Sequence, residues 1–403
     1  MYNLHLTPEQ LEIRDTVRAF AAKEIKPIAE KSARMEAVDR SPLEGALTQA
    51  AELGLKTLLL AEEAGGSGGD ALTAMIIAEE IAVGDPDTAA ILTETALVAR
   101  AAFGMLATSA QTKALLAKIE STPLAQLAWA RGLAEREVGN NYHRTQSTAQ
   151  AMVSAVKSGN TYVLNGTARG VANSPLAGLV IVSAASDAKS KSAKGLLAIA
   201  VPRGAQGMTV KSIASGKFHG ACGDITFDNC KVPADHLLGG ADGVAAAKAL
   251  AWLDAVPASS AVALGVGRAA YEAAIDYSKL RVQGGRPIIE HQAIADKLAS
   301  SAVRIETARS AIWAAAWAAE HPDAVSDGSL SRLPLATIAR IHTAEAMHRA
   351  AKDCAECFGA MGVMRDMPQH KYIDDARRFL HADGGVAEHK FRLAEAISGF
   401  RRE

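Results

Sequence analysis

The sequence contains an aspartate followed by two glycines, Asp383-Gly384-Gly385. Glycine lets the backbone turn where other residues cannot, so a carboxylate at this break can be aimed into a cleft. A carboxylate held in a cleft can act as a general base. The same side chain could instead cap a helix that begins near Gly385. A Gly-rich break and a short helix of basic and acidic residues come before the aspartate, and these elements would have to position it.

The size and composition of the chain set limits on its class. Its 403 residues suffice for two or three domains, and 49% hydrophobic with 22% charged residues is ordinary for a well-buried globule. A formal net charge of −1 gives no reason to expect a nucleic acid or an anionic membrane as partner. No apolar run is expected to span a membrane, and the start, MYNLHLTPEQ, lacks a signal-peptide core, so a cytoplasmic location is expected.

Two short motifs could suggest a metal or a phosphate, but each has a structural explanation. Cys354 and Cys357 form a CxxC in a stretch with a helical pattern, with no second pair at zinc-site spacing. We expect them to pack on one helical face, and no metal site is predicted. The glycines at 65, 66, 68 and 69 have neither a preceding βαβ context nor a lysine at Walker spacing, which favours a tight turn over phosphate binding.

The pattern of the chain changes twice. Residues up to about 120 have helical periodicity, beginning at Thr7-Pro8-Glu9-Gln10, which combines an N-cap, a proline at the first helical position and a capping-box glutamine. Short β-rich runs follow, separated by Gly, Asn, Ser and Pro. These runs are residues 126–130, 151–156, 162–165, 179–183, 196–201 and 225–228. Alanine-rich helices are expected at about 244–282, 288–320, 333–358 and 386–400, and they are too apolar to stand alone.

This order predicts an α+β fold with three domains. They are an N-terminal α-helical domain (residues 1–122), a middle β-barrel or sandwich domain (residues 123–240) and a C-terminal four-helix-bundle domain (residues 241–403).

Four segments in the same order resemble those of the acyl-CoA dehydrogenases. The matching segments are YVLNG at 162–166, FDNCKVPADHLLG at 227–239, RVQGGRPIIEHQAIADKLA at 281–299 and FGAMGVMRDMPQHKYIDDARRFLHADGG at 358–385. The family's order of helices, barrel and helices also matches, so the resemblance covers nearly the whole chain. It supports the same fold class.

The resemblance implies α,β-dehydrogenation of an acyl-CoA thioester, in which a carboxylate removes the α-proton and hydride passes to N5 of FAD. It assigns the base to Asp383, where most members of the family have glutamate. Aspartate is one methylene shorter, so its carboxylate falls about 1 Å short unless the backbone or substrate shifts, and such a misplacement can cost about 100-fold in rate. Asp254 is an alternative base, because some members carry theirs on the corresponding helix. The local sequence favours a solvated or capping acid beside Pro257 instead.

The resemblance also implies a set of partners and of residues that contact FAD. The partners are an acyl-CoA substrate and an electron acceptor such as electron-transferring flavoprotein, in a homo- or hetero-tetramer or a dimer. The residues implied for FAD are Arg281, Gln292, Asn173, Glu356, Gly359 and Gly384. Arg281 would pair with the pyrophosphate and Gln292 would hydrogen-bond nearby. Without that context, Arg281 could simply be a surface cation at a helix end.

Several positions depart from the family's pattern. The flavin-facing segment expected near residues 131–140 has RGLAEREVGN in place of "TEPxxGSD". Other changed positions are Gly170 for the tryptophan that covers the flavin, Gly284 for an aromatic residue and Val256 for an arginine of the acyl-CoA site. Losing aromatic cover removes stacking worth about 1 kcal/mol. Glu356, in place of a glutamine, would repel a pyrophosphate unless it were protonated or offset by Arg281.

These departures leave two alternatives open. The chain could be the cofactor-poor subunit of a hetero-oligomeric acyl-CoA dehydrogenase, supporting a partner that supplies the flavin contacts and the base. It could also be a flavin oxidase of the nitroalkane-oxidase type, which uses an aspartate base and no CoA.

Overall fold

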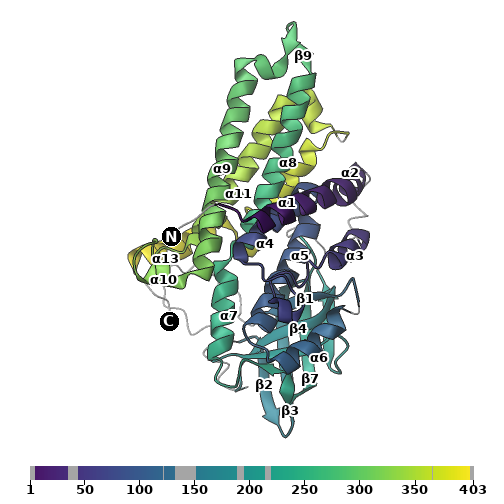
Figure 1. Ribbon diagram of the computed structural model, residues 1–403, viewed down its shortest axis with the longest axis vertical. Coiled ribbons are helices and arrows are strands. Elements are labelled where there is room, and N and C mark those ends of the chain that lie inside the picture. The colour runs from purple at the N-terminus through teal and green to yellow at the C-terminus, as the bar shows by residue number, and fades with distance from the viewer. Residues whose placement is uncertain are drawn as a thin grey trace.

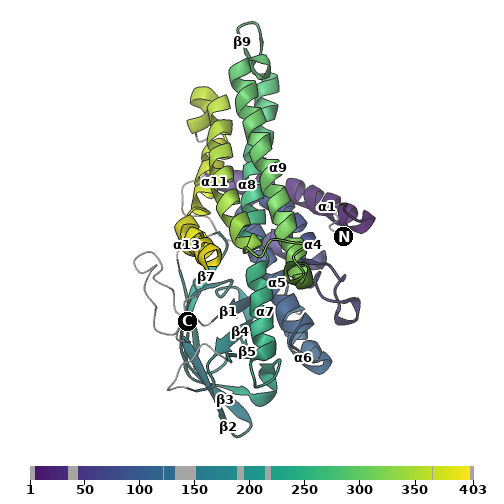
Figure 2. The ribbon, with the colours of Figure 1, turned by 90° about the vertical axis from the view of Figure 1, so that its left-hand side faces the viewer.

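The computed structural model of the protein describes residues 5–34, 44–120, 122–131, 151–187, 195–213, 219–364 and 366–399. The molecule is elongated, with a bundle of long helices at one end and β-sheets at the other (Figure 1). The view turned by 90° shows α8, α9 and α11 running side by side along the bundle (Figure 2).

The N-terminal region is helical, as predicted. Its elements are α1 (Pro8–Phe20), η1 (Ala21–Ile25), α2 (Lys26–Arg34), α3 (Glu44–Glu52), η2 (Glu62–Ala64), α4 (Ala71–Gly84), α5 (Pro86–Ala99), η3 (Arg100–Gly104) and α6 (Ser109–Glu120). The capping box is confirmed, because the Thr7 side chain accepts from Gln10 N while the Gln10 side chain accepts from Thr7 N. Helix α4 is buried along almost its whole length, between α5, α8 and α9.

The glycine loop at residues 65–69 is a tight turn, as expected. Its amide groups are used inside the protein: Gly65 donates to Glu62 O, Gly66 to Ala61 O, and Gly68 to Leu60 O. Backbone N–H groups that are already bonded cannot cradle a phosphate. The structure therefore excludes a phosphate site at these three amides.

Gly66→Ala is expected to destabilise the protein, because a Cβ at this position would lie 2.1 Å from the backbone oxygen of Leu60. Forcing the turn apart costs about 2–3 kcal/mol. Gly68→Ala is a matched control, since nothing lies within 4 Å of its Cβ and only its φ of +68° is unfavourable, at about 1 kcal/mol. Urea unfolding of the two variants measures the difference, and equal losses would contradict the close-approach explanation.

The middle region forms two four-stranded sheets in the described part of the chain, ordered β1-β4-β5-β8 and β2-β3-β7-β6. The strands are β1 (Gln126–Ala130), β2 (Val153–Ser158), β3 (Thr161–Ala172), β4 (Ala177–Ala184), β5 (Leu197–Pro202), β6 (Met208–Ser212), β7 (Cys222–Pro233) and β8 (Leu237–Leu238), with η4 (Ala234–His236) between the last two. Leu164 and Ile225 from one sheet share a core with Val180 and Ile199 from the other. The predicted sandwich is confirmed as these two packed sheets.

The C-terminal region is a helical bundle in which one expected helix is divided. Its elements are α7 (Val244–Ala255), α8 (Ala258–Leu280), β9 (Val282–Gln283), β10 (Arg286–Pro287), η5 (Ile288–Glu290), α9 (Gln292–Glu320), α10 (Pro322–Ser326), α11 (Leu335–Cys357), η6 (Gly359–Val363), α12 (Gln369–Arg378), η7 (Ala382–Gly384) and α13 (Gly385–Ser398). The single helix expected over residues 244–282 is wrong, because it breaks at Val256-Pro257. Proline lacks an N–H and pushes the preceding residue into extended geometry, and Val256 has φ −84° and ψ 124°.

The stretch Val244–Leu280 is long and apolar enough, by length and composition alone, to cross a membrane. The expectation that no apolar run is long enough to span a membrane is therefore wrong as far as length and composition go. In the fold, 67% of the apolar window is buried inside the protein, chiefly where α8 packs against α4, α9 and α11. Packing accounts for its apolar composition.

A buried cluster of charges joins the N-terminal helices to the bundle. Arg268 on α8 donates to Glu79 Oε1 at 2.7 Å and to Glu80 Oε1 at 2.9 Å, both on α4. Arg309 on α9 reaches Glu79 Oε1 at 2.7 Å, and Arg18 on α1 reaches Glu80 Oε1 at 2.8 Å. Each glutamate thus has two cations from different helices, which offsets the cost of burying its charge.

The CxxC cysteines pack inside the bundle, as predicted from their helical spacing. Cys354 and Cys357 lie on α11 and are 0% and 3% exposed. Burial raises the pKa of Cys354 to about 12 and that of Cys357 to about 11. Both therefore remain thiols near neutral pH, and thiols are poor metal ligands and nucleophiles.

Candidate active site

The turn that carries Asp383 follows α12 directly. Residues 382–384 form η7, and α13 begins at Gly385. Gly384 and Gly385 have φ of +88° and +80°, in the left-handed region that favours glycine. The structure places Gly384 at the N-cap of α13, so Asp383 is not the N-cap residue of that helix. The backbone of Asp383 is described, whereas its side chain lies outside the described part of the structure.

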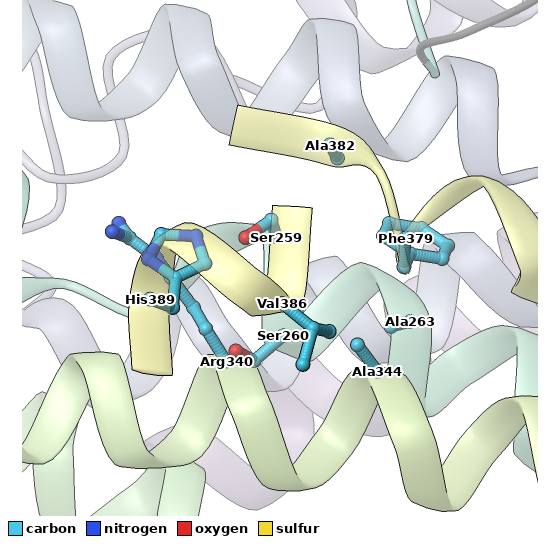
Figure 3. A pocket seen from close by; sticks show the side chains of 9 residues that line it. All are labelled: Ser259, Ser260, Ala263, Arg340, Ala344, Phe379, Ala382, Val386 and His389. Carbon is cyan, nitrogen blue, oxygen red and sulfur yellow. The ribbon is translucent and has the colours of Figure 1, made fainter. Parts of the chain in front are cut away.

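A small pocket lies beside this turn, between the first turn of α8, the middle of α11 and the start of α13 (Figure 3). Ala382 and Val386, on either side of Asp383 in sequence, both line it. The room inside is about 10 Å³, enough for about one water molecule. The predicted base therefore belongs to a turn that forms one wall of a pocket.

One end of the pocket is polar. Ser259, Ser260, Arg340 and His389 come together there from α8, α11 and α13 (Figure 3). Ser260 is 2% exposed, and its hydroxyl has no hydrogen-bond partner among the described residues. A buried hydroxyl without a partner is a costly arrangement unless another group supplies the bond.

The other end of the pocket is apolar, with Ala263, Ala344, Phe379 and Val386 around it (Figure 3). Sequence reasoning singled out neither Arg340 nor His389. The available signal was weak: Arg340 and Ala344 share a face of an alanine-rich helix by i,i+4 spacing, so a charge there could be expected to face inward.

The alternative base, Asp254, is on α7 and does not line this pocket. Its side chain is 67% exposed and pairs with Arg131, with 2.8 Å between Oδ1 and Nη1. Arg131 also lies 4.0 Å from Glu94 Oε2. These contacts favour the solvated acid over the base for Asp254.

Four of the residues implied for FAD gather at the far end of the bundle, around the β9–β10 hairpin. Arg281 is the C-cap residue after α8, Gln292 begins α9, and both are exposed. Glu356 and Gly359 follow on at the end of α11, which is joined to α8 by stacking of Phe358 on Tyr277 at 4.2 Å. Helix α8 has 23 residues and is about 35 Å long, so this group is remote from the pocket in the same chain.

The charge of Glu356 is offset, but not by Arg281. Lys297, one turn into α9, pairs with the Glu356 carboxylate. The hydrogen bond and charge of Lys297 lower the pKa of Glu356, so protonation of this acid near neutral pH is excluded. The sequence left protonation or Arg281 as the two ways to offset this charge, whereas the structure supplies Lys297, which was not considered.

The other two residues implied for FAD lie elsewhere. Gly384 belongs to the turn beside the pocket. Asn173 is 2% exposed and has a φ of +62°. Its amide nitrogen donates to Ile91 O at 2.8 Å and Leu127 O at 3.2 Å. These two bonds tie α5 to β1. The six predicted residues do not form one site within a single chain.

The fit of a flavin to these residues is mixed. Gly359 has φ +57° and open space around its Cβ position. Arg281 and Gln292 are exposed, so a guanidinium and an amide are open to solvent. Such donors suit an anionic dinucleotide. Gly170 also has open space where the family has an aromatic cover. The segment RGLAEREVGN lies outside the described residues from position 132 onward.

The protein has a helix–sheet–helix architecture, and residue 383 lies on a glycine turn beside a small pocket of the helical bundle. Residues 7–122 match the acyl-CoA dehydrogenase N-terminal domain and residues 256–397 match the acyl-CoA dehydrogenase C-terminal domain. The chain is 30% identical over 381 residues to the probable acyl-CoA dehydrogenase YngJ of Bacillus subtilis, covering 93% of this chain and 94% of YngJ. The chain belongs to the acyl-CoA dehydrogenase family.

Solved structures agree with this assignment. Butyryl-CoA dehydrogenase from Megasphaera elsdenii superposes with a TM-score of 0.80 at 25% identity, covering 98% of this chain and 100% of that chain. The FAD complex of PigA has a TM-score of 0.78 over 98% of this chain and 99% of that chain, at 17% identity, which shows the fold alone. Structural relatives of the protein are thus FAD flavoproteins, and the protein is an acyl-CoA dehydrogenase-like oxidoreductase.

Proposed function

We propose that the protein binds FAD and dehydrogenates an acyl-CoA thioester, with Asp383 as the base. The observation that carries the proposal is the glycine turn, which places residue 383 between two residues that line the pocket of α8 and α11. The Asp383 carboxylate would take the proton from the carbon next to the thioester carbonyl. Bound FAD would supply the acceptor for the hydride that leaves the β-carbon.

The surroundings of the turn suit this proton transfer. A base needs some desolvation to be effective near neutral pH, and Phe379, Val386 and Ala344 give one side of the pocket an apolar lining. The Ser260 hydroxyl offers a donor or acceptor to a polar atom that enters. Because aspartate is shorter than glutamate, we expect the substrate or turn to close the remaining distance of about 1 Å.

We propose that FAD is bound between subunits. Arg281 and Gln292 are too far from the pocket of their own chain to hold a flavin there. Exposed apolar side chains near them support a contact with a second subunit, because Leu280, Val282 and Val363 are 82%, 54% and 77% exposed. A homo- or hetero-tetramer, or a dimer, would bring the two sets of residues together, and electron-transferring flavoprotein would then accept the electrons.

One observation favours the alternative of a cofactor-poor subunit. At Gly170, where the family has its covering tryptophan, the main-chain N–H is bonded to Asp224 Oδ1 at 2.9 Å, and no side chain is present to stack on a flavin. In a hetero-oligomer, a homologous partner would supply the missing cover.

The purified protein is expected to be yellow, and butyryl-CoA is expected to bleach its flavin absorbance under anaerobic conditions. Butyryl-CoA is the probe because a butyryl-CoA dehydrogenase has the same fold at 25% identity. A protein that is colourless alone and yellow only with a co-expressed homologue would contradict the proposal and support the cofactor-poor subunit. A yellow protein bleached by a nitroalkane, but by no acyl-CoA, would support the oxidase.

A further inference from the structure

One buried histidine connects all three parts of the fold. His219 precedes β7, and its side chain is 4% exposed. Its Nδ1 is 2.9 Å from Asp87 Oδ1 on α5, and its Nε2 is 3.0 Å from the main-chain oxygen of Asp375 on α12. The imidazole therefore joins the β-sheet region to the N-terminal and C-terminal helices at once.

Both partners of His219 are acceptors. A main-chain carbonyl and an ionised carboxylate have no hydrogen to donate, so each can only accept a hydrogen bond. Burial opposes the ionisation of Asp87, but the hydrogen bond and charge of His219 outweigh it and lower the pKa of Asp87. Asp87 Oδ1 also accepts from Gly220 N at 3.0 Å. The ring satisfies both contacts only when each nitrogen carries a proton, that is, as the imidazolium.

Among the described residues, the charged groups near Asp87 and Asp375 belong to α5 and α12. Lys371 on α12 pairs with Asp375 and lies 3.9 Å from Asp85 on α5, and Arg378 lies 3.9 Å from Asp375. The ordinary pKa of histidine, about 6.5, is the one closest to neutrality in this set. Burial lowers the pKa of His219, but Asp87 and Asp375 outweigh burial, so the net direction is upward.

His219 also touches the wall of the pocket. Its ring stacks on Phe379 with centroids 4.6 Å apart and planes at 26°. Phe379 lines the pocket and is four residues before Asp383 in sequence (Figure 3). The contact made by the histidine thus reaches the turn that carries the proposed base.

We propose that His219, as an imidazolium, is a positioning residue that holds the turn of residues 379–386, and that this turn loosens when His219 loses its proton. The expected effect of His219 on catalytic rate rests on the proposed role of Asp383 as the base. The expected effect of His219 on the structure of residues 379–386 does not depend on that role. The pKa of His219 is raised in the fold. The hydrogen bonds of the imidazolium to Asp87 and Asp375 are therefore fully present below the unfolded pKa of about 6.5, and they are lost as pH rises through the folded pKa.

Hydrogen–deuterium exchange of the full-length protein tests this directly, in peptides that cover residues 379–389 and at pH values from about 6 to 9. After correction for intrinsic rates, wild-type exchange should rise with pH. His219→Leu should exchange about tenfold faster already at the low end of that range. His219→Arg keeps a permanent charge and several donors, so it should stay protected throughout. His236→Leu is the matched control, because His236 contacts Ala200 O at 2.8 Å, away from the pocket.

Wild-type exchange in this segment that does not change with pH, or that rises equally in His219→Arg, would overturn the proposal. Turnover of butyryl-CoA separates the two proposals. If Asp383 is the base, kcat of wild type should fall about tenfold over the pH range in which the turn loosens, and His219→Arg should remove that fall. If the protein does not turn over butyryl-CoA but shows the expected exchange pattern, the result would count against Asp383 as the base. It would still support the proposal that His219 holds the turn of residues 379–386.

Discussion

Asp383→Asn is expected to stop the bleaching of bound flavin by butyryl-CoA and to lower kcat by about 10²–10⁴-fold. Asparagine has nearly the same shape as aspartate but cannot accept the α-proton as a carboxylate does. FAD should remain bound, because the residues proposed to hold its pyrophosphate lie at the other end of α8. Stopped-flow absorbance gives the rate of bleaching, and the spectrum of the variant reports its flavin content.

Two variants serve as controls for this result. Asp383→Glu restores the longer side chain of the family and should keep activity within about tenfold of wild type, or raise it. Asp254→Asn removes the exposed acid that pairs with Arg131, and it should leave kcat nearly unchanged. Loss of activity in Asp254→Asn, with turnover preserved in Asp383→Asn, would make Asp254 the base instead.

Local signals in the sequence predicted the elements well where neighbouring residues determine them. The capping box at Thr7 and Gln10 involves residues three apart, so the sequence contains the whole interaction. The division of the helix at Val256-Pro257 was equally local but was not predicted, because alanine-rich periodicity continued past the proline. Backbone sterics outweigh periodicity at such a position.

The edge strand β6 was not predicted, although the edge strands β1 and β2 were. β6 alternates between half-buried and exposed residues from Met208 to Lys211, but none of its residues is fully buried, so its apolar signal is weak. It is held by backbone pairing with β7, a partner that begins more than ten residues later in the chain. Hydrogen bonds to a neighbouring strand leave little trace in the residue types of an edge.

Contacts between distant parts of the chain were also missed at the candidate active site. The family resemblance selected the turn at Asp383, but Arg340 and His219 are brought to it only by packing of α11 and of the loop before β7. Lys297 was not considered as the partner of Glu356, because the sequence does not show which cation packs against that carboxylate. Contacts between residues far apart in the chain depend on how helices cross, which no local pattern specifies.

The largest effect on stability is expected from Arg268→Met, which removes the cation shared by Glu79 and Glu80 in the interior. Arg268 is 8% exposed, and the two glutamates are 4% and 3% exposed. Arg309 and Arg18 still pair with Glu79 and Glu80, but both buried charges lose the cation that they share, at a cost of up to about 3–5 kcal/mol. Urea unfolding at neutral pH would measure this loss. Arg377→Met, which removes a 60% exposed arginine paired with Asp374, should cost at most about 1 kcal/mol.

The loss of stability in Arg268→Met is expected to depend on pH, whereas a loss caused only by poorer packing would not. Burial favours the neutral form of Glu80, but hydrogen bonds from Arg268 and Arg18 outweigh it and lower its pKa. Stability from Glu80 is therefore present above the unfolded pKa of about 4.3 and is lost as pH falls through the lower folded pKa. The difference between wild type and Arg268→Met should be largest near neutral pH and shrink in acid, where a protonated Glu80 no longer needs the cation. Adding Glu80→Gln to Arg268→Met should recover part of the loss, and a difference that is the same at every pH would assign the effect to packing.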